Sequence, residues 1–110
     1  MTNGSGTLGD LGRFAEPSLL ILVSLSDRPK HGYAIMEDID AIGDVRVGPG
    51  TLYAALARLE SRGLIESLPP EQRRRPYRLT GLGATALRAQ LEGLEGLARL
   101  GLRRLESGGS

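Results

Sequence analysis

Proline and glycine interrupt the chain so often that its first two thirds are predicted to form short helices. An apolar run at 19–25 predicts a first helix, with Ser18 as its N-cap and Pro29 following its end. Apolar residues at helical spacing predict a second helix that begins near His31 and is closed by Gly43.

The third predicted helix begins at Pro49, where the missing backbone N–H does no harm, and it runs to Arg62. Gly63 follows, and glycine commonly ends a helix at this position. The apolar residues of this helix share one face, and they are Leu52, Ala55, Leu56 and Leu59. Three short helices, the last two joined by a tight connection, are typical of a helix-turn-helix.

The periodicity changes after the third helix. Residues 64–68 alternate loosely as a strand does, two prolines and a polar loop follow, and 77–80 reads as the returning strand. A β-hairpin placed directly after a candidate recognition helix is a wing. From Thr80, the predicted cap, a long leucine-rich helix is expected.

The predicted fold is therefore mainly α with a small β-hairpin, a winged helix-turn-helix domain followed by a long C-terminal dimerisation helix. We expect the winged domain at 16–80 and the dimerisation helix at 81–106. The segments 1–15 and 107–110 are rich in small polar residues and are predicted to be flexible.

Length and composition exclude several classes. With 110 residues the chain has room for one core, and with four aromatic residues that core must be aliphatic. The absence of cysteine excludes disulfides and thiolate metal sites, and a single histidine gives an imidazole metal site no second ligand. We expect no signal peptide and no membrane span. No cofactor is predicted, and no nucleophile, phosphate loop or carboxylate pair suggests an enzyme.

The N-terminal end of the third helix carries the candidate base-reading residues. In a helix-turn-helix the second helix enters the major groove with its first residues against base edges. Small residues there let the backbone approach phosphates, a hydroxyl can contact a phosphate or base, and a tyrosine offers a flat ring. The candidates are Gly48, Pro49, Gly50, Thr51 and Tyr53. Alternatively, Pro49-Gly50 is a simple turn and Tyr53 a half-buried packing residue.

Basic residues supply the second signal. Arg73, Arg74 and Arg75 lie at the predicted wing tip, where they can reach phosphates or the minor groove. The alternative is a solvated loop. Lys30, His31 and Tyr33 are expected at the start of the second helix, which would cross the DNA backbone.

With these residues considered, the chain resembles the PadR-like transcriptional regulators. The similarity rests on His31-Gly32-Tyr33, on Pro49-Gly50-Thr51-Leu52-Tyr53 and on Tyr77-Arg78-Leu79-Thr80, within a span of about 16–90. The resemblance implies a winged-helix fold, homodimerisation through the C-terminal helix and repression of a nearby gene. It also implies DNA contact by Tyr33, Gly50, Thr51 and Tyr53. Family members often have serine where this chain has Gly48, so one hydroxyl contact would be absent.

The C-terminal helix is too leucine-rich to remain alone in solvent. A heptad-like stripe predicts a dimer interface formed by Leu87, Leu91, Leu94, Ala98 and Leu105. Three glycines, Gly93, Gly96 and Gly101, either allow close helix approach or mark a frayed helix end. A twofold dimer would place two recognition helices about 34 Å apart and predicts a pseudo-palindromic site.

We therefore expect a sequence-specific repressor that binds double-stranded DNA as a homodimer in the cytoplasm, in association with the nucleoid. An aliphatic dimer interface would also suit a small hydrophobic effector. The competing interpretation is a winged helix used only for protein–protein contact, since the fold does not dictate the function.

Overall fold

A computed structural model describes residues 16–43 and 46–108. Three helices come first, apart from one short strand: α2 (Pro17–Ser24), β1 (Lys30–His31), α3 (Gly32–Gly43) and α4 (Pro49–Ser61). Two more strands and a long helix follow: β2 (Ile65–Ser67), β3 (Pro76–Leu79) and α5 (Gly81–Gly108). The predicted flexible segment 1–15 and residues 109–110 lie outside the described residues.

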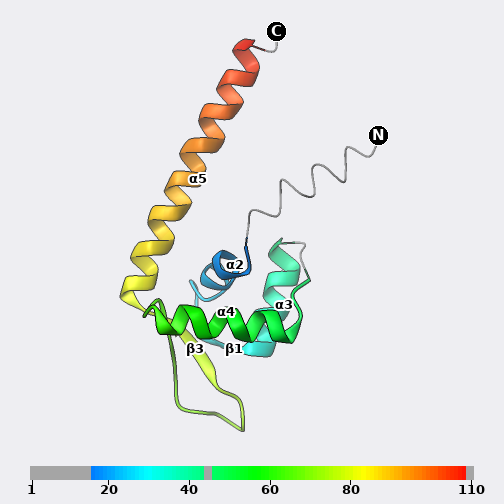
Figure 1. Cartoon of the computed structure of the whole chain (residues 1–110), viewed down its shortest axis with the longest axis vertical. Coiled ribbons are helices and arrows are strands. Elements are labelled where there is room, and N and C mark those ends of the chain that lie inside the picture. The colour runs from blue at the N-terminus through cyan, green and yellow to red at the C-terminus, as the bar shows by residue number, and fades with distance from the viewer. Residues whose placement is uncertain (1–15, 44–45, 109–110) are drawn as a thin grey trace.

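Helices α2, α3 and α4 pack around one aliphatic core (Figure 1). The side chains that are almost wholly excluded from solvent come from all three helices and from β2; the large apolar ones are Ile21, Ile35, Ile39, Leu52, Leu56 and Ile65. Because these residues recur at helical spacing, each helix presents one apolar face to the others. Helix α2 is the central element, since it contacts α3, α4 and α5.

Prolines begin two of these helices, although one predicted cap was wrong. Pro17 and Pro49 both lie in the first turn of their helices. Glu16, and not Ser18 as predicted, is the N-cap residue of α2, because Pro17 already belongs to the helix. Gly48 is the N-cap residue of α4, as expected for a residue before Pro49.

Gly63 ends α4 in a Schellman motif. Its φ is +76°, a left-handed conformation that glycine adopts without steric strain. The Gly63 amide donates to the Glu60 carbonyl (2.9 Å) and the Leu64 amide to the Leu59 carbonyl (3.0 Å). These two bonds satisfy carbonyls that the end of the helix would otherwise leave unpaired. The chain then turns directly into β2.

The sheet has three antiparallel strands in the order β1-β3-β2. The predicted hairpin is present, with Ser67 opposite Tyr77 and Ile65 opposite Leu79. The strand β1 was not predicted: Lys30 and His31, expected at the start of a helix, instead pair with Tyr77 and Pro76. The fold class is otherwise as predicted, mainly helical with a small antiparallel sheet.

Helix α5 leaves the domain as a long arm. Thr80 caps it as predicted: its Oγ1 accepts a hydrogen bond from the Gly83 amide (2.9 Å) and donates one to the Gly63 carbonyl (2.6 Å). The helix runs to Gly108, two residues beyond the predicted end at 106. In Figure 1 the wing and α5 extend to opposite sides of α4, and the molecule measures 57 × 31 × 20 Å.

Candidate nucleic-acid interface

The first two turns of α4 present a surface that the core does not use. Gly48, Pro49, Gly50, Thr51 and Tyr53 are all exposed, whereas the apolar residues of the same helix are buried on its other side. Among the described residues, no side chain caps this helix end. The amides of its first turn are therefore open to an anion, toward which the helix dipole is favourable.

Gly48 and Gly50 are not required by packing within the protomer. A Cβ atom built on either residue would meet no atom of the described residues within 4 Å, and neither residue has a positive φ. Small residues at these two positions keep the backbone accessible on the outer side of the helix. This arrangement is compatible with the close approach of a phosphate that was predicted from the sequence.

Tyr53 and Tyr33 are both about half exposed, at 50% and 59%. Tyr53 packs on the first residue of α3, because a Cβ atom on Gly32 would lie 2.3 Å from its hydroxyl oxygen and 2.8 Å from its Cζ. Glycine at position 32 is thus what allows the tyrosine ring to lie across the start of α3. Tyr53 is both packed and accessible, so the two interpretations of this residue do not exclude each other.

Lys30 does not lie on this surface, contrary to the prediction. The residue is only 7% exposed. Its ammonium group donates to the Ser24 carbonyl, lies 2.6 Å from Asp27 Oδ1 and 3.7 Å from Asp38 Oδ2. A buried cation with three oxygen partners has a structural role, so the prediction that Lys30 contacts DNA is wrong. The ammonium lowers the pKa of the Asp27 carboxyl by hydrogen bonding.

His31 joins β1 to the wing. Its Nε2 lies 3.1 Å from Arg74 Nη1, and its Nδ1 lies 3.4 Å from the Ala34 amide. A neutral imidazole has one acceptor nitrogen, and a guanidinium can only donate. Arg74 can therefore donate to Nε2 only in the tautomer in which that nitrogen carries no proton.

The wing ends in a two-residue turn. The Glu71 and Arg74 backbones exchange two hydrogen bonds, of 2.6 and 2.8 Å, and Gln72 and Arg73 between them have φ values of 50° and 68°. Two positive φ values in a two-residue turn are the pattern of type I′, which asparagine and glycine adopt more easily than glutamine and arginine. Arg73 and Arg74 lie in this turn and Arg75 directly follows it, and all three side chains are exposed.

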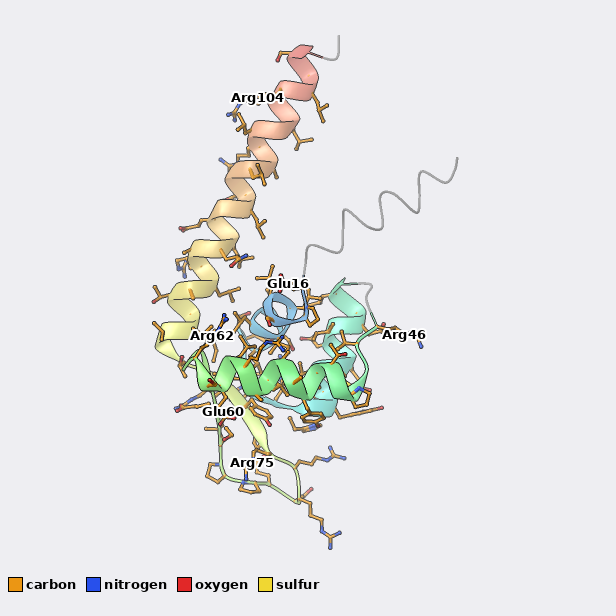
Figure 2. The ribbon with its side chains drawn as sticks, viewed as in Figure 1. Glu16, Arg46, Glu60, Arg62, Arg75 and Arg104 are labelled. Atoms are coloured by element: carbon orange, nitrogen blue, oxygen red, sulfur yellow. The ribbon has the colours of Figure 1, made fainter. Side chains whose placement is uncertain are left out.

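Ser67 and Glu60, which the sequence did not single out, connect the wing arginine Arg75 to α4. Arg75 Nη1 donates to Ser67 Oγ (3.4 Å), and that hydroxyl donates to Glu60 Oε2 (2.8 Å). Figure 2 shows Glu60 near the C-terminal part of α4 and Arg75 on the hairpin below it. The pKa of Tyr77 is raised mainly by burial, and further by Glu60 and Tyr53. No local pattern could have found this network, because its members come from three elements.

Arg46 is a further residue that the sequence interpretation missed. It is labelled in Figure 2 beside the connection from α3 to α4, two residues before the N-cap of α4. Its side chain is 92% exposed and makes a long 4.0 Å contact with Asp40. The available signal was that Arg46 is the sole basic residue between the two helices of the predicted helix-turn-helix.

The predicted dimer residues of α5 fall into two groups. Leu87 belongs to the protomer's own core and is 5% exposed, so it is not free to form an interface as predicted. Leu94 is partly buried, whereas Leu91, Ala98 and Leu105 are exposed. A groove of about 540 Å³ lies between the end of α2 and this part of α5, lined in part by Val23, Leu87 and Leu91.

No helix of the described part of the chain is long and apolar enough to cross a membrane. Among the same residues, no three His, Cys, Asp or Glu side chains gather as metal ligands would.

A helix-turn-helix followed directly by a β-hairpin defines a winged helix-turn-helix protein. The family model described as the transcriptional regulator PadR-like family matches residues 21–89. The chain therefore belongs to the PadR-like family of transcriptional regulators, as its motifs suggested. PadR-like regulators bind DNA and are not enzymes.

Two relatives are similar to this chain in sequence. The chain is 42% identical over 87 residues to Transcriptional regulator Rv3488 of Mycobacterium tuberculosis, covering 74% of this chain and 78% of that protein. It is 41% identical over 95 residues to an uncharacterized 37.1 kDa protein in transposon TN4556 of Streptomyces fradiae. That match covers 86% of this chain and 27% of the relative, so the chain spans about a quarter of its length.

A solved structure shares the fold. The crystal structure of a PadR family transcription regulator from hypervirulent Clostridium difficile R20291 superposes with a TM-score of 0.73 at 26% sequence identity. The superposition covers 81% of this chain and 97% of that chain.

Proposed function

We propose that the protein is a sequence-specific repressor that binds a pseudo-palindromic operator as a homodimer. The observation that carries the proposal is the division of the molecule into two unlike surfaces. The uncapped start of α4 and the arginine-bearing wing lie on one side, and the exposed leucines of α5 extend on the other (Figure 1). One side suits a polyanion and the other a second copy of the chain.

In this proposal the start of α4 lies in the major groove. The open amides of the first turn bind a phosphate, and the bare backbone at Gly48, Pro49 and Gly50 allows its close approach. Thr51 offers a hydroxyl and a methyl group to the base edges, and Tyr53 offers the exposed part of its ring. Tyr33 flanks these residues at the start of α3.

Basic side chains supply the sequence-independent part of the affinity. The wing carries Arg73, Arg74 and Arg75, and His31 lies at its base. Arg46 is added to the proposal because its guanidinium is in solvent close to the start of α4. Lysine and arginine side chains that neutralise phosphates release counterions, so binding weakens as the salt concentration rises.

The dimer interface in this proposal is the outer part of α5. Of the predicted residues, Leu91, Leu94, Ala98 and Leu105 remain available, and Leu97, Leu100 and Leu102 are exposed beside them. A contiguous apolar surface of this kind on a water-exposed helix is typical of a protein interface. A twofold axis through α5 would place two α4 helices about 34 Å apart on the duplex.

The proposal includes release by a small hydrophobic effector. Support comes from the groove between α2 and α5, whose volume is typical of small-molecule sites and whose lining combines aliphatic side chains with Ser26, Arg88, Glu92 and Glu95. An effector bound beside the dimer helix would change the spacing of the two recognition helices. The proposal also places the repressor in the cytoplasm, on nucleoid DNA.

The test is a titration of the purified protein with labelled duplex from the DNA upstream of its own gene, read by fluorescence anisotropy over a salt series. We expect nanomolar affinity that falls steeply with salt. The double substitution Thr51→Ala/Tyr53→Ala should weaken binding by about 1–3 kcal/mol. The matched control is Ser61→Ala, which removes a hydroxyl from the exposed, opposite end of the same helix.

The contrary result is weak binding that the double substitution leaves unchanged on both the upstream duplex and a random duplex. In that case the start of α4 does not read DNA, and the winged domain would serve protein–protein contact.

A further inference from the structure

The three wing arginines are adjacent in the sequence but differ in what their guanidinium groups contact. Arg74 is engaged by His31, with its Nη1 3.1 Å from the imidazole Nε2. Arg75 is engaged by Ser67, whose hydroxyl is in turn bound to Glu60 of α4. For Arg73, among the described residues, there is no hydrogen bond or ion pair to its side chain.

The two engaged arginines connect the wing to different parts of the domain. Through His31, Arg74 joins the hairpin to β1 and the start of α3. Through Ser67 and Glu60, Arg75 joins it to the C-terminal part of α4. The wing is thus held on two sides, and the contacts fix its direction relative to the recognition helix.

Arg73 occupies the second central position of the turn, with a φ of 68°. Glycine is the usual residue at this position of a type I′ turn, because a side chain is disfavoured by the positive φ. The turn therefore carries an arginine at a position where the backbone would be more relaxed without a side chain. A residue in a strained conformation at a loop tip, whose charged group has no partner among the described residues, is a candidate functional residue.

We propose that Arg73 is the wing residue that binds a phosphate of duplex DNA, whereas Arg74 and Arg75 are positioning residues that orient the wing. The proposal rests on the DNA-binding function proposed above and assigns separate roles within its wing. Because a phosphate contact carries no base information, Arg73 strengthens binding to all duplexes alike.

Three matched single substitutions test this division: Arg73→Gln, Arg74→Gln and Arg75→Gln. Each removes one positive charge per protomer and keeps a polar side chain with an N–H donor, although glutamine is shorter than arginine. Affinity is measured over a salt series on the upstream duplex and on a random duplex, and circular dichroism checks that each variant is folded.

We expect Arg73→Gln to lower affinity about tenfold on both duplexes and to reduce the slope of log K against log salt by roughly 0.9 per protomer. Arg74→Gln and Arg75→Gln should reduce that slope much less, because their guanidinium groups contact His31 and Ser67 instead of a phosphate. A positioning role predicts a further result for Arg74: His31→Ala and Arg74→Ala should each lower affinity a few-fold, and the double variant should lose no more than either single variant.

Two results would overturn the division of roles while leaving the DNA-binding function intact. One is a slope reduction for Arg74→Gln or Arg75→Gln equal to that for Arg73→Gln. The other is an unchanged slope for Arg73→Gln while Thr51→Ala/Tyr53→Ala still weakens binding. If the wild-type protein shows no salt-dependent binding at all, the proposed function fails and the role of Arg73 fails with it.

Discussion

At the scale of single residues, the position of a basic side chain matters more than its presence. The sequence places Lys30 beside His31 and Tyr33, and all three were predicted to contact DNA. In the structure the lysine is buried under α2 and α3 with its ammonium neutralised, while Tyr33 is in solvent. The difference arises because β1 pairs with β3, which turns the Lys30 side chain inward.

Substituting Lys30→Met should lower the free energy of unfolding by about 2 kcal/mol, because the Ser24 carbonyl and Asp38 lose a charged donor inside the fold. Methionine keeps most of the buried aliphatic volume. The measurement is urea denaturation followed by circular dichroism. DNA affinity of the folded variant should stay within about twofold of wild type, and a lower affinity at unchanged stability would restore Lys30 as a DNA contact.

The contact between Lys30 and Asp27 should make the stability of the protein depend on pH. Lys30 holds the pKa of the Asp27 carboxyl below its ordinary value of 3.8. A lowered pKa in the folded state stabilises the protein above that ordinary value, and the contribution is lost as the pH falls through the lower, folded pKa. Asp27→Asn should therefore flatten the dependence of unfolding free energy on pH below about 4. If the unfolding free energy of Asp27→Asn and of wild type changed equally with pH below about 4, the Lys30–Asp27 pair would contribute nothing to stability.

Gly32 is a third case, because its lack of a side chain positions another residue. In Gly32→Ala the new methyl group would occupy the place of the Tyr53 hydroxyl, so the ring must move. We expect DNA affinity to fall by about 1–3 kcal/mol, as for loss of Tyr53 itself. In a Tyr53→Ala background the same change should have no further effect. Additive losses in this double-mutant cycle would show that Gly32 acts independently of Tyr53.

At the scale of elements, the residues that begin, end or cap helices made most of the fold predictable. Pro49, Gly63 and Thr80 act through backbone geometry within a few residues, so their roles as start, stop and cap could be predicted and are confirmed. The strand β1 could not, because its pairing partner Tyr77 is far along the chain. The wing turn likewise lacks the asparagine and glycine that normally mark type I′.

In the candidate DNA-contact surface, too, features set by local sequence could be predicted and features set by tertiary packing could not. The exposed start of α4 could be predicted because a helix with one apolar face must expose the other, and Thr51 and Tyr53 lie on that other face. The contacts of Arg74 and Arg75 could not be predicted, because they depend on how the hairpin packs against β1 and α4. Adjacent arginines are equivalent in a sequence and become distinct only in three dimensions.

The junction between the wing and α5 provides a prediction at this scale. A Cβ atom on Gly83 would lie 2.0 Å from the Leu64 carbonyl oxygen, a backbone atom that cannot easily move. Gly83→Ala should therefore destabilise the protein by about 3 kcal/mol or more. Gly81→Ala is the matched control, since nothing lies within 4 Å of its Cβ position. Equal melting temperatures for the two variants would mean that α5 shifts freely against β2.

At the scale of the whole molecule, α5 is far longer than the domain needs. Its first turns contribute Gly83 and Leu87 to the buried interior, and the remainder extends into solvent with exposed leucines. Among the described residues nothing lies within 4 Å of a Cβ atom built on Gly93, Gly96 or Gly101, so packing within this part of the protomer does not require glycine there. An isolated helix of this composition is better explained as half of an interface.

Charged substitutions on this helix should separate folding from association. Leu91→Glu/Leu105→Glu is expected to leave a folded monomer, because both side chains are exposed in the protomer, at 42% and 70%. Sedimentation velocity gives the mass, and Ala89→Glu, exposed and outside the predicted stripe, is the control. By contrast, Leu87→Ala should lower the free energy of unfolding by about 2–5 kcal/mol. A dimer that survives the double substitution would place the interface elsewhere.

The most direct test of the central proposal, two α4 helices of one dimer on one DNA face, is hydroxyl-radical footprinting on the upstream duplex. We predict two protected patches whose centres are about 10 base pairs apart, arranged as an inverted repeat. The monomeric Leu91→Glu/Leu105→Glu variant should lose both patches at concentrations that saturate the wild type. A single protected patch, or the same footprint from the monomeric variant, would contradict the proposed dimeric recognition.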